Sequence, residues 1–127
     1  MSKLLSIISI TYNDLKGLEY TLASITEENE DVEHIIVDGN STDGTKDLLK
    51  GLSDTYKWVS ESDKGLYDAM NKGVSLAKGD WICFMNAGDL FADFENIDIA
   101  NLLINIDSDV GVLYGDCDVL FENKYAT

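Results

Sequence analysis

Polar and acidic side chains gather in three short segments of the chain, each of which follows an apolar run. Their oxygens could accept hydrogen bonds from a ligand, and the carboxylate and amide oxygens would also suit a hard cation such as Mg²⁺ or Mn²⁺. Because parallel strands end at one edge of a sheet, segments that follow such strands can build a single site. The three segments are Thr11-Tyr12-Asn13, residues 38–44 and Asn86-Ala87-Gly88-Asp89.

Residues 39–44 share two glycines with a phosphate-binding P-loop, but the sequence excludes that motif. A P-loop needs Lys and then Ser or Thr directly after its second glycine. Here Thr45 precedes Lys46, and Asp38 and Asp43 would place negative charge where the phosphates must lie. An aspartate at the end of a buried strand is better suited to accept hydrogen bonds from a nucleobase or a sugar hydroxyl.

Two further candidates each allow a structural reading. Asn86 and Asp89 would suit Mg²⁺ or Mn²⁺ if substrate phosphates completed the coordination shell, yet an Asn/Asp/Gly cluster after a strand also forms ordinary turns. Lys64, which lies between Asp63 and Gly65, could meet a diphosphate as a point charge. It could equally be an exposed lysine at the start of a capped helix.

The composition limits the class of protein. A chain of 127 residues fits one domain, residues 1–127, and a hydrophobic share of 45% is ordinary for a globular protein. The net charge is −15, with nine lysines and no arginine, which excludes binding to nucleic acid or an anionic membrane through bulk charge. No apolar run approaches the roughly 20 residues of a membrane span. We therefore expect a cytoplasmic protein whose acidic excess is a solvated surface, a set of cation ligands, or a face for a basic segment.

The cysteines and the single histidine are expected to be structural. Cys83 and Cys117 lie in apolar, strand-like contexts without CxxC spacing, which predicts buried free thiols. His34 opens a strand and has no Cys or His ligand partner nearby, so we favour a structural role over metal binding.

Strand and helix patterns alternate along the chain and predict a largely parallel α/β sheet with helices on both faces. The expected strands cover residues 4–10, 35–37, 58–59, 81–85 and 110–114. The expected helices begin after Asn13 or Asp14, after Thr42 or Asp43, at about Leu66, and near Ile99. The third helix should run to Lys78, with Gly79 after its end and with Leu66, Met70, Val74 and Ala77 facing inward.

Four segments in order make a far more specific pattern than any one of them, and together they resemble the family 2 glycosyltransferases. The closest resemblance is to bacterial enzymes that build exopolysaccharide and O-antigen repeat units, and it extends over residues 4–118. It implies the GT-A fold, a Rossmann-like sandwich that binds nucleotide sugars. The segments are residues 6–13 (SIISITYN), 35–45 (IIVDGNSTDGT), 62–73 (SDKGLYDAMNKG) and 79–89 (GDWICFMNAGD).

The resemblance also implies a role for each candidate residue. Asp38 would contact the nucleobase, usually uracil, and Asp63 and Lys64 would touch the base and the diphosphate. Asp89 matches the last acid of the metal-binding DxD-type motif for Mn²⁺ or Mg²⁺. Because Asn86 and Gly88 depart from the commoner acidic pattern, the cation would need the nucleotide diphosphate as a further ligand. The implied nucleotide-sugar-binding set is Thr11, Tyr12, Asn13, Asp38, Asn40, Ser41, Asp63, Lys64, Asn86, Ala87 and Gly88.

By the same resemblance the chain would be the N-terminal donor-binding part of an inverting glycosyltransferase. The donor would be a nucleotide diphospho-sugar and the acceptor a glycan or a lipid-linked molecule. The general base is expected beyond Thr127, because Asp116 and Asp118 match an earlier acidic strand end. Peripheral association with the cytoplasmic face of the inner membrane or with partner enzymes is expected, as is self-association through exposed apolar surface.

Two rival interpretations remain at this point. The chain could be a nucleotide-sugar-binding module without catalysis, since the general-base segment is not in it. It could also be a nucleotidyltransferase of similar sheet architecture, which is less favoured because those enzymes use an arginine- and glycine-rich phosphate loop and this chain has no arginine.

Overall fold

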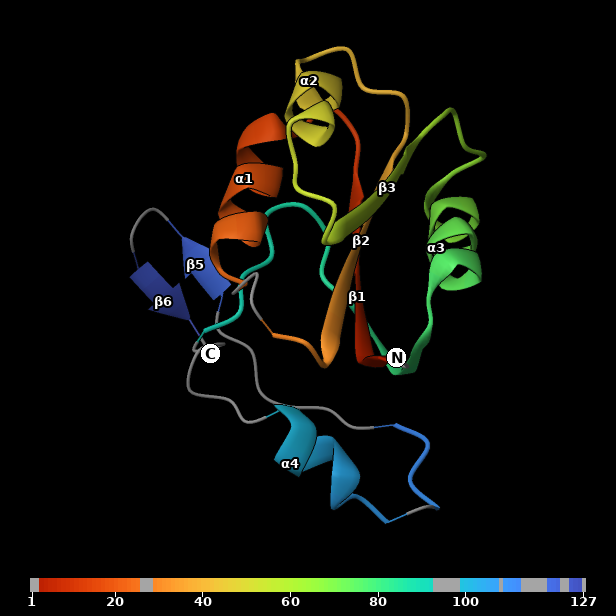
Figure 1. The fold of residues 1–127 in the computed structure, drawn as a ribbon. Coiled ribbons are helices and arrows are strands. Elements are labelled where there is room, and N and C mark those ends of the chain that lie inside the picture. The colour runs from red at the N-terminus through yellow and green to blue at the C-terminus, as the bar shows by residue number, and fades with distance from the viewer. Residues whose placement is uncertain are drawn as a thin grey trace.

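The computed structural model describes residues 3–25, 29–92, 99–107, 109–112, 119–121 and 124–126. Helices and strands alternate along the chain, as the sequence pattern predicts (Figure 1). The elements are β1 (Lys3–Thr11), α1 (Leu15–Ala23), β2 (Val32–Asp38), α2 (Thr45–Lys50), β3 (Tyr56–Ser60), α3 (Leu66–Leu76), β4 (Gly79–Phe84), α4 (Ile99–Ile104), β5 (Val119–Phe121) and β6 (Lys124–Ala126).

The main sheet has four parallel strands in the order β3-β2-β1-β4. Thr11 pairs with Asp38, and Asp38 pairs with Ser60, so the first three strands end at the same level. The chain after β4 continues beside β1, because the Ala87 N–H donates to the Ile10 carbonyl at 3.0 Å. The register therefore brings all the predicted loops to one edge. β5 and β6 form a separate antiparallel pair.

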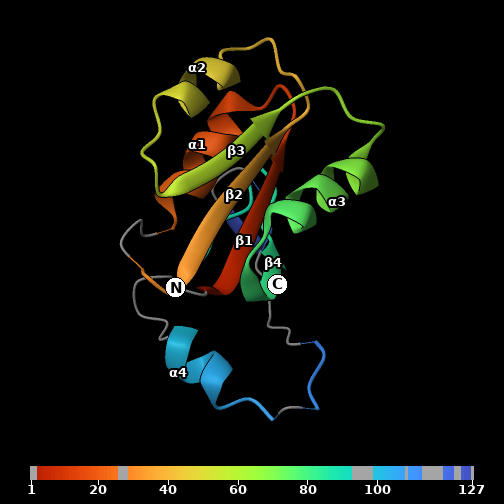
Figure 2. The ribbon, with the colours of Figure 1, turned by 45° about the vertical axis from the view of Figure 1, so that its right-hand side comes forward.

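Helices cover both faces of this sheet (Figure 2). On one face, Leu18 of α1 and Leu49 of α2 pack with Ile36. On the other face, Ala69 of α3 packs with Ile8 and Val37. Side chains of a strand alternate between faces, so Thr11 and Asp38 lie on the α1 and α2 side. Among the helices of the described residues, none is long and apolar enough to cross a membrane.

The predicted buried face of α3 is wrong at Leu66 and Val74, although Ala77, which follows the helix, does pack against the core. Leu66 is 51% exposed and Val74 is 42% exposed, whereas Ala69 and Gly73 are buried. A Cβ placed on Gly73 would lie 2.4 Å from Cγ2 of Ile8, so only a residue without a side chain fits where the helix crosses the strand. The helix approaches the sheet along its smallest residues because the strands already fill the space with large ones.

Two predicted helix boundaries are also corrected. α3 ends at Leu76, because Ala77 has extended backbone angles and Gly79 begins β4. The N-cap of α2 is Gly44 in the left-handed region (φ 98°), where glycine is favoured. Asp43 instead accepts the Thr45 N–H at 3.2 Å. The predicted Asp14 cap of α1 is confirmed, since its carboxylate accepts the Gly17 N–H at 3.1 Å.

The strand predicted at residues 110–114 is wrong where the structure describes it. Val110, Gly111 and Val112 are not in a strand, and the rest of that predicted strand lies outside the described residues.

Cys83 is a free thiol, but it is only partly buried because β4 lies at the edge of the described sheet. Burial, and then the charge of Asp89, raise the pKa of this thiol. Cys117 lies outside the described residues.

The end of the sheet away from the loops is held by a buried carboxylate. Glu33, which is 4% exposed, accepts hydrogen bonds from the Ser6 hydroxyl, from Lys57 Nζ at 2.8 Å, from the Lys78 N–H and from the Gly79 N–H at 3.1 Å. Burial raises the pKa of Glu33, but these hydrogen bonds and the Lys57 charge outweigh it and lower the pKa. One side chain thus ties β1, β2, β3 and the start of β4 together.

Candidate functional site

The loops after β1 and β2 are joined by hydrogen bonds between backbone and side chains. The Asn13 N–H donates to Ser41 Oγ at 2.8 Å, and the Thr42 N–H donates to Asn13 Oδ1 at 2.8 Å. The Gly39 N–H also donates to the Thr11 carbonyl at 3.0 Å. Asn13 and Asn40 have positive φ angles of 48° and 70°, a conformation that asparagine tolerates better than most residues. The two loops therefore form one connected surface.

Asp38 lies beneath this surface and is fully buried. Its Oδ2 accepts the Ser41 N–H at 3.1 Å and the Ser60 hydroxyl at 2.7 Å, and its Oδ1 accepts the Ser41 hydroxyl. Ser41 Oγ in turn accepts the Asn13 N–H, so Asp38 orients both loops through Ser41. Because Asp38 has no exposed surface, direct contact with a base would require the loops that cover it to move.

Tyr12 and Asp63 flank Gly39 and leave between them only a narrow gap, in which even an added Cβ would be crowded. A Cβ added to Gly39 would lie 3.0 Å from Asp63 Oδ2 and 3.3 Å from Tyr12 Cδ1. The Tyr12 ring is 65% exposed. Asp63 Oδ1 accepts the Gly65 N–H at 3.1 Å, which directs the other oxygen toward the gap. An exposed ring beside a carboxylate can stack on a planar ligand and accept its N–H or O–H donors.

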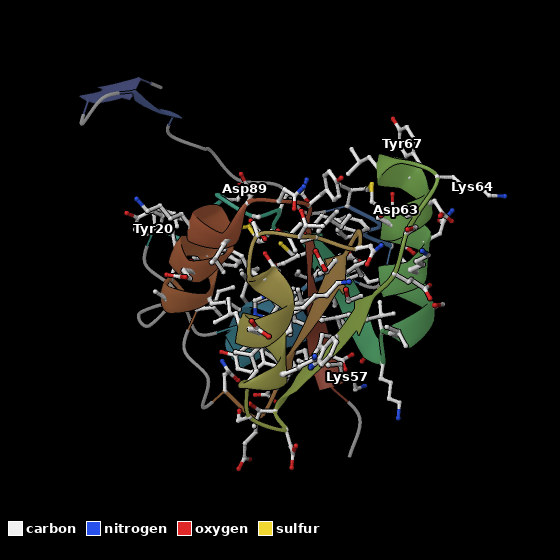
Figure 3. The ribbon with its side chains drawn as sticks, turned by 90° about the horizontal axis from the view of Figure 1, so that it is seen from above. Tyr20, Lys57, Asp63, Lys64, Tyr67 and Asp89 are labelled. Carbon is white, nitrogen blue, oxygen red and sulfur yellow. The ribbon has the colours of Figure 1, made fainter. Side chains whose placement is uncertain are left out.

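The lysines near the gap, Lys64 and Lys46, either point away from it or are hydrogen-bonded to a neighbouring residue. Lys64 and Tyr67 point outward from the start of α3, and Lys64 lies far from Asp89 (Figure 3). Lys46 Nζ donates to Asn40 Oδ1 at the rim of the second loop. Hydrogen bonds from the Thr45 hydroxyl and then from the Leu15 and Thr45 N–H groups lower the pKa of Asp43, although burial raises it. The edge is therefore strongly acidic, and a diphosphate would need a cation there.

The Asn86–Asp89 segment is a closed turn that ends in an exposed carboxylate. The Asp89 N–H donates to the Asn86 carbonyl at 2.8 Å, and Asp89 Oδ2 accepts the Asn86 N–H at 3.0 Å. Gly88 has a φ of 97°, which favours glycine. Seen from above, Asp89 lies on the α1 side of the strand ends and Asp63 lies on the α3 side (Figure 3).

Two buried oxygens at this edge have no hydrogen-bond partner within the part of the chain that the structure describes. They are Thr11 Oγ1, at the end of β1, and Asn86 Oδ1, in the turn after the neighbouring strand β4. Buried polar atoms in native proteins nearly always have a partner, so unpaired ones indicate a place for a ligand, an ion or water. The Asn86 oxygen and the Asp89 carboxylate suit a hard cation. No group of three or more His, Cys, Asp or Glu side chains among the described residues could hold a metal ion.

Sequence patterns missed two residues that hold this edge together. Ser60 ends β3 and donates to Asp38, and Thr21 of α1 accepts the Gly88 N–H at 2.9 Å. Thr21 is fully buried among the apolar residues of α1. No local signal in the sequence marks either residue, because each contacts a segment that is distant in the chain.

Residues 6–122 match the family model "Glycosyl transferase family 2". The chain belongs to glycosyltransferase family 2. This membership agrees with the resemblance that the four sequence segments carry.

Several mycobacterial relatives of this family 2 chain are similar over much of its length. An uncharacterized glycosyltransferase of Mycobacterium tuberculosis is 40% identical over 90 residues, which is 68% of this chain and 34% of that protein. A PGL/p-HBAD biosynthesis glycosyltransferase of Mycobacterium bovis is 34% identical over 116 residues, which is 87% of this chain and 45% of that protein. The chain thus spans less than half the length of these curated relatives.

A solved structure supports the fold. A mannosyltransferase from Pyrobaculum calidifontis, in complex with GDP-Man and Mn²⁺, superposes with a TM-score of 0.69 at 23% sequence identity. The match covers 84% of this chain and 33% of that one. The predicted GT-A fold, with its parallel sheet and flanking helices, is confirmed.

Proposed function

We propose that residues 1–127 form a single domain that binds the donor nucleotide and the cation of an inverting glycosyltransferase. The donor is a nucleotide diphospho-sugar, preferably UDP-linked, and the acceptor is a glycan or a lipid-linked molecule of cell-surface polysaccharide synthesis. The observation that carries this proposal is the convergence of the Tyr12–Gly39–Asp63 gap and the Asp89 turn at one edge of the sheet.

The nucleoside lies on the gap above Gly39. The exposed Tyr12 ring stacks on the base, and Asp63 accepts a hydrogen bond from it. Asn13, Asn40 and Ser41 shape the loops beside the ribose. Asp38 serves this site from below, because it fixes Ser41 and through it Asn13.

The diphosphate lies at the Asn86–Asp89 turn. Asp89 and the unpaired Asn86 amide oxygen would hold Mn²⁺ or Mg²⁺, which neutralises the charge of the leaving diphosphate. The acidic surroundings favour this arrangement, since carboxylates would otherwise repel the phosphates. The bound Mn²⁺ of the archaeal mannosyltransferase supports the choice of cation.

Transfer then inverts the anomeric carbon. The acceptor oxygen bonds to that carbon from one face while the bond to the diphosphate oxygen breaks on the other. The proton of the acceptor hydroxyl goes to a carboxylate general base. We place this base in polypeptide equivalent to the region beyond Thr127. Asp116 and Asp118 lie outside the described residues.

Isothermal titration with UDP and with GDP, each with and without Mn²⁺, tests the donor site. We expect cation-dependent binding of a nucleoside diphosphate, with UDP preferred, although GDP is the nucleotide of the archaeal neighbour. Asp89→Asn keeps an oxygen for the Asn86 N–H and should weaken the Mn²⁺-dependent binding at least about tenfold. Absence of binding to any nucleoside diphosphate would overturn the proposal.

A second candidate function is a nucleotide-sugar-binding module without catalysis. Donor hydrolysis or sugar transfer by the 127-residue chain alone would exclude it. Donor binding without turnover would support it, provided that addition of a partner polypeptide restored turnover.

We further propose a cytoplasmic location, with peripheral association at the inner membrane or with partner enzymes. The net charge of −15 disfavours direct attraction to anionic lipid, so contact through a lipid-linked acceptor or a partner is the expected route. Co-sedimentation with anionic vesicles should therefore be weak in the absence of acceptor.

A further inference from the structure

Helix α1 presents a line of small and polar residues to the loop that follows β4. Gly17, Thr21 and Ser24 are spaced four and three residues apart, so they share one side of the helix. The Gly88 N–H donates to the Gly17 carbonyl at 3.0 Å and to Thr21 Oγ1 at 2.9 Å. The Phe91 N–H donates to Ser24 Oγ at 3.2 Å. The helix thus binds this loop at several points.

Thr21 makes the central contact. Its hydroxyl is fully buried and lies 3.1 Å from the Gly17 carbonyl and 3.3 Å from the Asn86 carbonyl, either of which can accept its proton. The same oxygen accepts the Gly88 N–H. One side chain therefore contacts residues on both sides of Ala87, within the turn that Asp89 closes.

We propose that Thr21 is a positioning residue for the cation site. Its hydroxyl fixes the Asn86–Asp89 turn so that the Asp89 carboxylate and the Asn86 amide oxygen face the same ligand. This inference rests on the proposed function, in which Asp89 holds the cation. Thr21 acts through the turn and does not touch the cation or the substrate.

The small number of ligands makes such positioning important. A site with one carboxylate gains little affinity from charge alone, so it depends on how well its oxygens are held in place. The Gly17 carbonyl would keep the Gly88 N–H paired if the Thr21 hydroxyl were lost. The turn would then remain but would be less well defined.

Two substitutions separate the hydroxyl from the shape of the side chain. Thr21→Val keeps the volume and removes the hydroxyl, whereas Thr21→Ser keeps the hydroxyl. We expect Thr21→Val to weaken Mn²⁺-dependent binding of the nucleoside diphosphate about tenfold, while metal-free binding of the nucleoside stays within twofold. Thr21→Ser should restore most of the affinity. Thr45→Val removes another fully buried threonine hydroxyl, and should leave the ratio of the two affinities unchanged.

Amide hydrogen exchange supplies a readout that does not depend on nucleotide. The Gly88 amide should exchange at least about fivefold faster in Thr21→Val than in the wild type or in Thr21→Ser, because it loses its shorter hydrogen bond. Unchanged Gly88 exchange would overturn the proposal, as would equal loss of cation-dependent and metal-free binding. If the wild type binds no nucleoside diphosphate, the proposed function fails, and the role of Thr21 in a cation site fails with it even where Gly88 exchange responds.

Discussion

Three of the carboxylates at the edge of the sheet, Asp38, Asp63 and Asp89, differ in what they can still offer a ligand. Asp38 is enclosed, and three donors from Ser41 and Ser60 occupy its oxygens. Asp63 is partly buried and directs one oxygen at the gap above Gly39. Asp89 is exposed and uses one oxygen to close its own turn. Under the proposed function, these differences assign a structural role to Asp38 and binding roles to Asp63 and Asp89.

Replacement of Asp38 by asparagine should therefore lower the stability of the fold, whereas replacement of Asp63 should weaken nucleoside binding. In Asp38→Asn an amide NH₂ would face hydroxyl or N–H donors in a buried site, which should lower the free energy of unfolding by about 1–3 kcal/mol. Asp63→Asn should leave that free energy within about 0.5 kcal/mol and should weaken nucleoside binding instead. Urea denaturation and titration of both variants check this.

Two outcomes would contradict the roles given to Asp38 and Asp63. If Asp38→Asn abolished nucleoside binding at full stability, Asp38 would contact the base directly, as the family resemblance implies. If Asp63→Asn bound nucleoside as tightly as the wild type, the gap above Gly39 would not be the base site.

At the scale of elements, the sheet and its loops could be predicted from the sequence, whereas the contact between α3 and the sheet could not. Apolar runs followed by Asp, Asn and Gly mark strand ends well, because buried parallel strands are continuously apolar. The face of α3 was predicted from its large apolar residues, yet the helix buries Ala69 and Gly73. A search for large residues cannot detect a contact that depends on the absence of a side chain.

The same limit explains the polar residues that were missed. Thr21 lies between Tyr20 and Leu22, and Ser60 begins a polar segment. Each matters only through a loop that is distant in the sequence. Their partners depend on the register of β4 beside β1 and of β3 beside β2. Local patterns carry no information on such pairings until the fold is known.

Gly73→Ala tests the close approach of α3. The added Cβ would lie 2.4 Å from Cγ2 of the fully buried Ile8 and 3.4 Å from Cγ2 of Val37. Overpacking of this kind costs about 1–3 kcal/mol, which should exceed the roughly 1 kcal/mol that alanine gains in helix propensity. We expect a net loss of stability by thermal or urea denaturation.

Gly51→Ala is the matched control for this substitution. Gly51 follows α2 with right-handed angles (φ −88°, ψ −4°), and its added Cβ would meet nothing nearer than 3.6 Å. This variant should be neutral or more stable by about 0.4–1 kcal/mol. A Gly73→Ala protein as stable as Gly51→Ala would show that the helix can move away from the sheet.

At the scale of the whole molecule, two buried groups couple stability to pH in the same direction. His34 is 5% exposed, its Nε2 lies 2.7 Å from the Ser9 hydroxyl, and burial lowers its pKa to about 4. Its Nδ1 has no acceptor among the described residues, so protonation would leave a buried donor unpaired. Glu33 has a lowered pKa and stabilises the fold in its ionised form.

The fold should therefore weaken in mild acid. Above the unfolded pKa of His34, both states are neutral at this residue; below it the unfolded state takes up the proton first, so stability falls until the pH reaches the folded value of about 4. Between pH 6.5 and pH 5 the loss should be about 2 kcal/mol, at about 1.4 kcal/mol for each pH unit. The loss from Glu33 adds as the pH drops through its own lowered pKa. Urea denaturation of the wild type and of His34→Gln, which cannot titrate, measures the His34 contribution by difference, and equal slopes for the two proteins would contradict it.

The sheet face beside α3 is where we expect the molecule to self-associate at high concentration. Ile82 and Phe84 of β4 pair with Ser6 and Ile8 and share their face, but they remain 41% and 37% exposed because α3 packs on β1 and β2. β4 is also an edge strand of the described sheet. An exposed edge with apolar side chains favours pairing with another chain.

We expect this face to drive self-association, opposed by the net charge of −15. Light scattering over a concentration series should show a mass above that of the 14.0 kDa monomer, increasing with salt as the repulsion is screened. Ile82→Glu should shift the chain toward the monomer. Val112→Glu adds the same charge at a residue that is 79% exposed and outside the sheet, so it should have a smaller effect. If the two variants dissociated equally, charge alone would explain the change, and the β4 face would not be the interface.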